Sequence, residues 1–81
     1  MNCYNTLLKM DPTTERVLAI AGGIPGALKV LGAVYGECTD AEFVSFLDRL
    51  EGHSIRGSTI WVMYNECGSD STKFMNQVYN L

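Results

Sequence analysis

The chain is short, rich in apolar residues and mildly acidic. It has 81 residues, of which 47% are apolar, and a net charge of −3 at pH 7. This apolar content predicts a folded chain rather than a disordered one, and the length allows one domain over residues 1–81 with a small core. The negative charge disfavours binding to nucleic acid or to an anionic membrane through a general electrostatic field.

The sequence also disfavours membrane, secreted and metal-binding classes. No apolar run approaches the roughly 18 residues that a membrane-spanning helix needs, and the first residues lack the basic and apolar regions of a signal peptide. Cys3, Cys38 and Cys67 are widely spaced, and there is a single histidine. An odd number of cysteines without a CxxC pair indicates a reduced, cytoplasmic protein with no metal site, and no cofactor is expected.

The first half of the chain predicts two helices separated by a glycine-rich turn. Asp11 and Pro12 are typical of an N-cap and a first helical residue, and Gly22-Gly23 is expected to end that helix. Pro25 can start the second helix, which Gly36 ends. The apolar positions at helical spacing are Val17, Leu18, Ala21 and Ile24 in the first segment, and Ala27, Leu28, Leu31, Val34 and Tyr35 in the second.

A third helix has the clearest start signal in the sequence. Thr39-Asp40-Ala41-Glu42 matches a capping box, and Cys38 with Phe43 can form a hydrophobic staple across it. Gly52 is the expected C-cap. The inner face is predicted to hold Phe43, Phe46, Leu47 and Leu50, and the outer face Ser45, Asp48, Arg49 and Glu51.

Two further helices are expected after residue 57. Ser58 can cap a fourth helix that Gly68 closes, and Ser69 or Asp70 can open a fifth. The β-branched residues in 59–62 could instead form a strand, but the sequence offers no second strand to pair with it. The predicted fold is therefore all-α, a compact orthogonal bundle of four or five short helices. The apolar positions are Ile60, Trp61, Met63 and Tyr64, then Phe74, Met75, Val78 and Tyr79.

The stretch AGGIPGALK, residues 21–29, allows two interpretations. A helix start that follows glycines exposes free N–H groups and the positive end of the helix dipole, which together favour phosphate binding, and Lys29 lies one turn further on. However, the spacing matches neither of the common phosphate-binding glycine motifs. The alternative is a tight turn in which Gly22 and Gly23 end one helix and Pro25 starts the next.

The sequence gives little support to catalysis. His53 is the single histidine, and no serine or cysteine is linked to it by a known motif. Asp48, Glu51 and Glu66 could pair, but charged helix faces are usually only solvated. The cysteines lack basic neighbours that would lower their pKa, so they are expected to act as small apolar side chains. We therefore expect the protein not to be an enzyme.

Residues 43–66 resemble a helix-turn-helix of transcription factors. A glycine-bearing turn leads into Ser58-Thr59, which could start a recognition helix. Such a helix normally presents arginine, lysine, asparagine or glutamine to base edges, whereas the exposed positions here would be Val62, Asn65 and Glu66. A DNA-binding regulator is therefore an alternative, disfavoured by the net charge.

Two segments, GGIPGALKVL and SIRGSTIWVMYNEC, are similar to short proteins of unassigned function carried by tailed bacteriophages. Those proteins pair a GGIPGA turn with a later IRGS-x-I-[WY] segment, and the resemblance covers about half of this chain. It assigns no catalytic role to any residue. What it implies is a small accessory protein that works by binding in the host cytoplasm, either blocking a host protein or sequestering a nucleotide signal of host defence.

The functional hypothesis is a non-enzymatic binding protein, expected to be a homo-oligomer, that captures a nucleotide-like ligand or a host protein. If the two glycine turns converge, their helix starts and nearby cations would form one anion pocket. Trp61 and Tyr64 could add a stacking face for a base, or an apolar anchor. A structural or assembly protein is a third hypothesis. The candidate ligand-binding residues are Gly22, Gly23, Gly26, Lys29, Arg56, Gly57, Ser58, Thr59, Trp61 and Tyr64.

Overall fold

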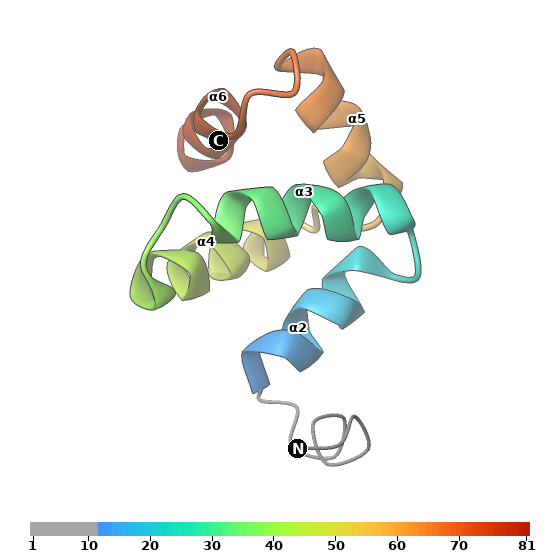
Figure 1. Cartoon of the computed structure of the whole chain (residues 1–81), viewed down its shortest axis with the longest axis vertical. Helices are drawn as coiled ribbons and strands as arrows, with labels where there is room; N and C mark the ends of the chain where they lie inside the picture. The colour runs from blue at the N-terminus through green and yellow to red at the C-terminus, as the bar shows by residue number, and fades with distance from the viewer. Residues whose placement is uncertain (1–11) are drawn as a thin grey trace.

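A computed structural model gives the arrangement of the chain and describes residues 12–81. Within this part all regular structure is helical, which confirms the predicted all-α bundle (Figure 1). The expected N-cap Asp11 and the thiol of Cys3 lie outside the described residues. The five helices are α2 (Pro12–Ala21), α3 (Pro25–Tyr35), α4 (Asp40–Gly52), α5 (Ser58–Glu66) and α6 (Ser71–Tyr79).

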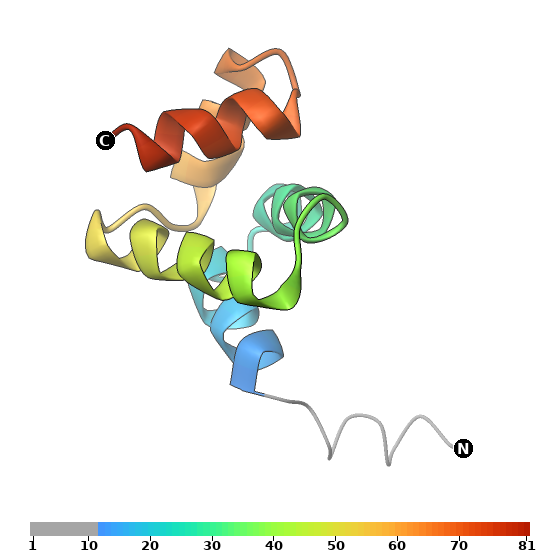
Figure 2. The same cartoon turned by 90° about the vertical axis from the view of Figure 1, so that its left-hand side faces the viewer.

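Helix α3 crosses the middle of the molecule. Helices α2 and α4 lie on one side of it and α5 and α6 on the other, as Figures 1 and 2 show from two directions. All four pack against α3, and α4 also packs against α2 and α6. The segment 59–62 is part of α5 and not a strand.

The core is apolar throughout residues 12–81, with no buried polar or charged side chain among them. Edge-to-face contacts of Phe74 with Phe46 and Tyr64, at centroid distances of 5.7 and 5.9 Å, link α6 to α4 and α5. Burial of this apolar surface is the main force holding the short helices together. The buried residues are Ile20, Ala21, Ala27, Val30, Leu31, Val34, Phe43, Phe46, Leu47, Leu50, Ile55, Ile60, Phe74 and Val78.

Some apolar positions differ from the expected core, and the exposed ones among them are Leu18, Tyr35, Trp61 and Tyr79. Ile24 caps α3 instead of continuing the first helix. Leu18 is 43% exposed and Tyr35 is 50% exposed. The Tyr35 ring contacts Phe43 edge to face at 4.9 Å and its hydroxyl donates to Asp40 Oδ1 at 3.0 Å, so the ring covers the core edge while its polar end stays outside.

The helix ends mostly follow the sequence signals, with two corrections. Thr39 and Asp70 cap α4 and α6 through their side chains, and Gly68 follows the end of α5 as expected. Gly52, however, is the last residue of α4 and not its cap, because the left-handed residue of the closing turn is Ser54, with φ +56°. Likewise Ser58 is the first residue of α5, and Gly57 is its N-cap.

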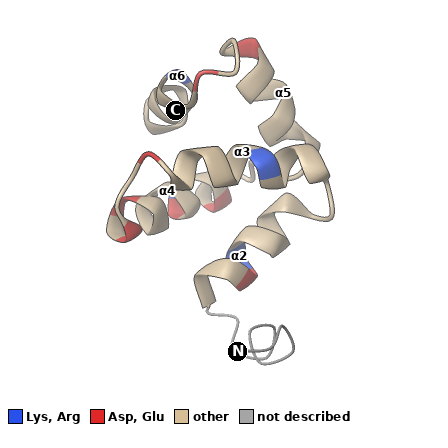
Figure 3. Ribbon diagram, viewed as in Figure 1, with Lys and Arg blue, Asp and Glu red and all other residues tan. Residues whose placement is uncertain are grey.

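The described helices are all too short or too polar to cross a membrane. Acidic residues gather along α4, whereas α3 carries a single basic position (Figure 3).

Candidate functional site

The first glycine turn is a tight reversal between α2 and α3. Gly22 and Gly23 have φ values of +60° and +78°, in the left-handed region that glycine adopts without a steric penalty. Gly22 N–H donates to Leu18 O at 3.0 Å, and Ile24 N–H donates to Ala21 O at 3.1 Å. Pro25 then begins α3 directly. The turn thus joins two helices, as one of the two interpretations of AGGIPGALK expected.

The second glycine turn lies against the first. Gly57 N–H donates to Ile20 O at 2.8 Å, in the last turn of α2. A Cβ on Gly57 would lie 3.8 Å from Ile24 Cγ1 and 3.9 Å from Ala21 O, and the φ of +58° with ψ of −136° is open only to glycine. The end of α2 and the starts of α3 and α5 therefore meet at one side of the molecule, on the right in Figure 1, and we call this region the turn junction.

Both helices that begin at the turn junction lack a side-chain cap. Neither Ile24 nor Gly57 offers one. The N–H groups of Ser58 and Thr59 have no acceptor within residues 12–81, and both residues are exposed. Because unsatisfied N–H groups and the helix dipole add up at such an end, the start of α5 presents a partial positive charge to solvent.

Two cations flank the turn junction. Lys29 on α3 and Arg56 before α5 are exposed, and neither forms an ion pair within the described part of the chain. The structure does not place them in one hollow. Arg56 lines a hollow of about 210 Å³, which Lys29 does not line. The residues around it are Arg16, Ala19, Ile20, Glu51, Ile55 and Arg56.

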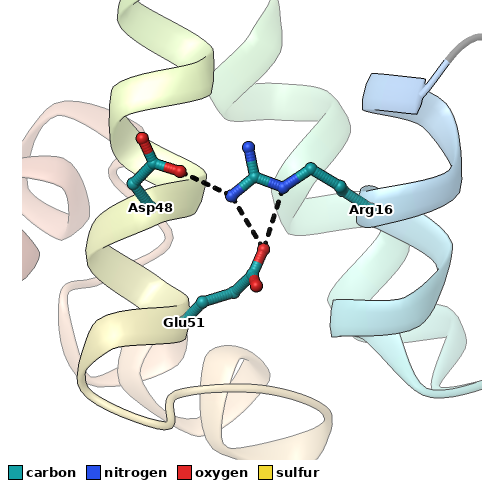
Figure 4. A network of polar contacts seen from close by, with 3 residues as sticks. All are labelled: Arg16, Asp48 and Glu51. Atoms are coloured by element: carbon teal, nitrogen blue, oxygen red, sulfur yellow. Dashed lines mark hydrogen bonds and ion pairs between the residues drawn. The ribbon is translucent and has the colours of Figure 1, made fainter.

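Arg16 is a member of this region that the sequence did not single out. Its Nη2 donates to Asp48 Oδ1 at 2.7 Å and to Glu51 Oε1 at 2.8 Å, and its Nε donates to Glu51 Oε1 at 2.9 Å (Figure 4). The hydrogen bond to Glu51, followed by that to Asp48, raises the pKa of Arg16. The outer face of α4, expected to be only solvated, therefore forms ion pairs with α2. The sequence did contain a signal for this contact, because Asp48 and Glu51 lie three residues apart on one face of a helix and can together pair with a basic side chain.

The two aromatic candidates have different surroundings. Trp61 is 36% exposed, and its indole lies on Gly26, where an added Cβ would come within 2.8 Å of Trp61 Cδ2. Tyr64 is partly buried and packs against Phe74, while its ring stacks with Trp61 at 6.5 Å. Trp61 thus presents a partly exposed ring next to the start of α3, and Tyr64 packs against it from the core side.

His53 and the two described cysteines lie in different surroundings. His53 is exposed and caps α4 through its backbone N–H. Burial, and next the charge of Glu42, raise the pKa of the Cys38 thiol, which donates to Val34 O at 3.1 Å. Cys67 donates to Gln77 Oε1 at 2.9 Å. Among residues 12–81 no three histidine, cysteine or acidic side chains are placed to hold a metal ion.

Residues 43–66 were compared in the sequence with a helix-turn-helix, and the packing and side chains of α5 bear on that alternative. Helix α5 packs against α3 and α6, whereas α4 packs mainly against α2, α3 and α6. The amide of Asn65 donates to Trp61 O at 2.9 Å within its own helix, and α5 carries no basic residue. These features disfavour reading of base edges by α5.

Comparison of the chain with family models, with curated proteins and with solved structures found no match. The functional argument therefore rests on the residues and the geometry of the turn junction.

Proposed function

We propose that this protein is a non-enzymatic binding protein that captures a phosphate-bearing, nucleotide-like ligand at the turn junction. The observation that carries the proposal is the hydrogen bond from Gly57 N–H to Ile20 O. It holds the uncapped start of α5 beside the glycine turn before α3. Two helix starts side by side supply N–H donors and positive potential of the kind that binds phosphate groups.

The side chains around the turn junction suit the other parts of such a ligand. Lys29 and Arg56 add full positive charges, and charge-assisted hydrogen bonds to phosphate are stronger than neutral ones. The exposed part of the Trp61 indole can contact a base. Glycine at positions 22 and 23 leaves the backbone accessible on the turn side, since a Cβ at either position would meet open space.

The biological role that fits the sequence resemblance is a phage accessory protein that antagonises a host defence process by removing a nucleotide signal. Capture of a host protein through the same face is the other form of this proposal, with Trp61 as the apolar anchor. A DNA-binding regulator and an assembly protein predict different results in the experiment below.

Calorimetric titration and thermal shift of the full chain with linear and cyclic nucleotides test the proposal, with nucleosides and inorganic phosphate as reference probes. A ligand at 100 times its Kd is expected to stabilise the fold by about 2.7 kcal/mol. Lys29→Ala and Arg56→Ala are each expected to weaken binding by roughly 10- to 100-fold, because a charge-assisted hydrogen bond contributes about 1.5–3 kcal/mol.

Lys73→Ala is the matched control, since Lys73 is an exposed cation of α6 without an ion pair in the described chain. It is expected to leave both binding and melting temperature unchanged. Binding that the Lys29 and Arg56 variants do not weaken would contradict the turn junction as the site. Steeply salt-dependent binding to duplex DNA in place of nucleotides would favour the regulator, and capture of a host protein alone would favour the second form.

A further inference from the structure

The hollow of about 210 Å³ that Arg16 and Arg56 line, which we call the arginine hollow, lies directly beside the turn junction. Ile20 also lines it, and Ile20 O accepts the hydrogen bond from Gly57 N–H that joins the two glycine turns. Arg56 directly precedes Gly57 in the chain. A ligand whose phosphate lies at the start of α5 can therefore extend its other parts into this hollow.

Two charged side chains of the arginine hollow keep unused hydrogen-bonding capacity. Glu51 accepts the hydrogen bonds of Arg16 on Oε1 alone, so its Oε2 has no partner within residues 12–81 (Figure 4). Arg56 is exposed and its guanidinium forms no hydrogen bond or ion pair with the described residues. The hollow thus offers one free carboxylate oxygen and the N–H donors of one free guanidinium.

The charges around the arginine hollow suit a neutral group better than a second phosphate. Glu51 and Asp48 together neutralise Arg16 and offset the charge of Arg56. Ile20 and Glu51 also lie in the last turns of α2 and α4, where the negative ends of the helix dipoles oppose a further anion. The rest of the lining is small or aliphatic, from Ala19, Ile20 and Ile55.

We propose that the arginine hollow binds the base of the nucleotide and selects guanine. This inference rests on the proposed function, because it assigns a place to the base of the same ligand. Guanine carries N–H donors at N1 and N2, which Glu51 Oε2 can accept, and the acceptors O6 and N7, which suit an arginine such as Arg56. Adenine has an acceptor at N1, which would face the Glu51 carboxylate without a proton between them.

Calorimetric titration of the full chain with guanosine, inosine and adenosine monophosphates tests the proposal. The inosine nucleotide differs from the guanosine nucleotide only by the absence of the N2 amino group. We expect the guanosine nucleotide to bind at least about tenfold more tightly than either of the others, because each of them loses a charge-assisted hydrogen bond to Glu51. This ranking is measured on the wild type and depends on no variant.

Glu51→Gln is the key variant, and Asp48→Asn is its matched control. Each removes one of the two ion-pair partners of Arg16, but Glu51 lines the arginine hollow and Asp48 does not. We expect the preference for the guanosine over the inosine nucleotide to fall about tenfold in Glu51→Gln and to persist in Asp48→Asn. The melting temperatures of the two variants are expected to be similar, since each keeps one ion pair.

Two results would overturn the assignment of the base while leaving the turn junction standing. The first is equal affinity of the wild type for the three nucleotides, with binding still weakened by Lys29→Ala and Arg56→Ala. The second is a guanine preference that Glu51→Gln does not reduce, which would place the base outside the arginine hollow. Absence of binding by every nucleotide would overturn the proposed function and this inference together.

Discussion

Gly26 and Gly32 both lie in α3, but their surroundings differ. A Cβ at Gly26 would lie 2.8 Å from Trp61 Cδ2, closer than real Cβ contacts allow, whereas a Cβ at Gly32 meets nothing within 4 Å. Gly26 therefore lets the indole of Trp61 lie directly on the α3 backbone. The sequence predicted Gly26 as a ligand-binding residue; the structure shows that the indole of Trp61 packs against it.

Alanine at these two positions is expected to have opposite effects. Gly26→Ala forces the indole away, and overpacking of this kind lowers the free energy of unfolding by about 1–3 kcal/mol. Gly32→Ala only improves helix propensity, so it is expected to raise the free energy of unfolding by about 0.5–1 kcal/mol. Chemical denaturation measures both changes in the free energy of unfolding. The fluorescence emission of the single tryptophan reports the surroundings of its indole, and we expect this emission to shift to the red in Gly26→Ala alone. Equal emission in both variants would contradict the contact.

Features of single residues, such as turn glycines and helix caps, could be predicted from the sequence where they depend on neighbouring residues in the chain. The left-handed glycines at 22 and 23 and the cap at Asp70 depend on residues within one turn. The contact of Gly26 with Trp61 and the ion pairs of Arg16 join residues far apart in the chain, and no local pattern specifies such pairs. The N-cap of α5 was missed for the same reason, because Gly57 takes its conformation from a hydrogen bond to α2.

At the scale of elements, α4 has the most completely capped start. Thr39 Oγ1 accepts from Glu42 N–H at 3.2 Å, and Glu42 Oε1 accepts from Thr39 N–H at 2.8 Å, which confirms the predicted capping box. The hydrogen bond from the Thr39 backbone, and then that with its side chain, lower the pKa of Glu42 below its ordinary value of 4.5. The carboxylate form is therefore favoured in the folded state.

This lowered pKa predicts an acid-dependent loss of stability. The stabilisation from Glu42 is complete above its unfolded pKa and is lost as the pH falls through its lower folded pKa. Glu42→Gln keeps an acceptor for Thr39 N–H but does not titrate, so its unfolding free energy is expected to vary less with pH below 4.5 than that of the wild type. Denaturant unfolding between pH 3 and 7 measures the difference.

Thr39→Ala is the companion variant for the capping box. This variant is expected to lower the free energy of unfolding by about 1 kcal/mol at neutral pH, because it removes one of the two hydrogen bonds of the capping box. Ligand binding is expected to remain unchanged. A pH dependence of Glu42→Gln identical to that of the wild type would show that other carboxylates control acid unfolding. A loss of affinity in Thr39→Ala would place the ligand at α4 instead of the turn junction.

At the scale of the whole molecule, the composition and helical periodicity were enough to predict the fold class but not the packing partners. Each apolar stripe shows that a helix buries one face, yet it does not name the helix that covers it. The central position of α3, with helices on both sides, and the meeting of the two glycine turns are therefore properties of the assembled bundle. The candidate residues could be named from the sequence, but the separation of Arg56, which lines a hollow beside Arg16 and Glu51, from Lys29, which does not, could not be predicted.

The surface of the bundle bears on self-association. Val62 on α5 is 51% exposed, on a helix whose sole charged residue is Glu66. An uncharged apolar face on an acidic protein is where two copies can approach with little electrostatic repulsion, and burying it is favourable. Small chains also bury a limited share of their surface alone, so association adds to their stability.

We therefore expect the protein to be a homo-oligomer at micromolar concentration. Light scattering coupled to gel filtration should give a multiple of the chain mass of 8.9 kDa. Because the contact is apolar, added salt should leave the assembly intact or strengthen it by screening the net charge of −3. A mass of one chain at every concentration would contradict the prediction, and dissociation by salt would show that ion pairs, not the α5 face, hold the copies together.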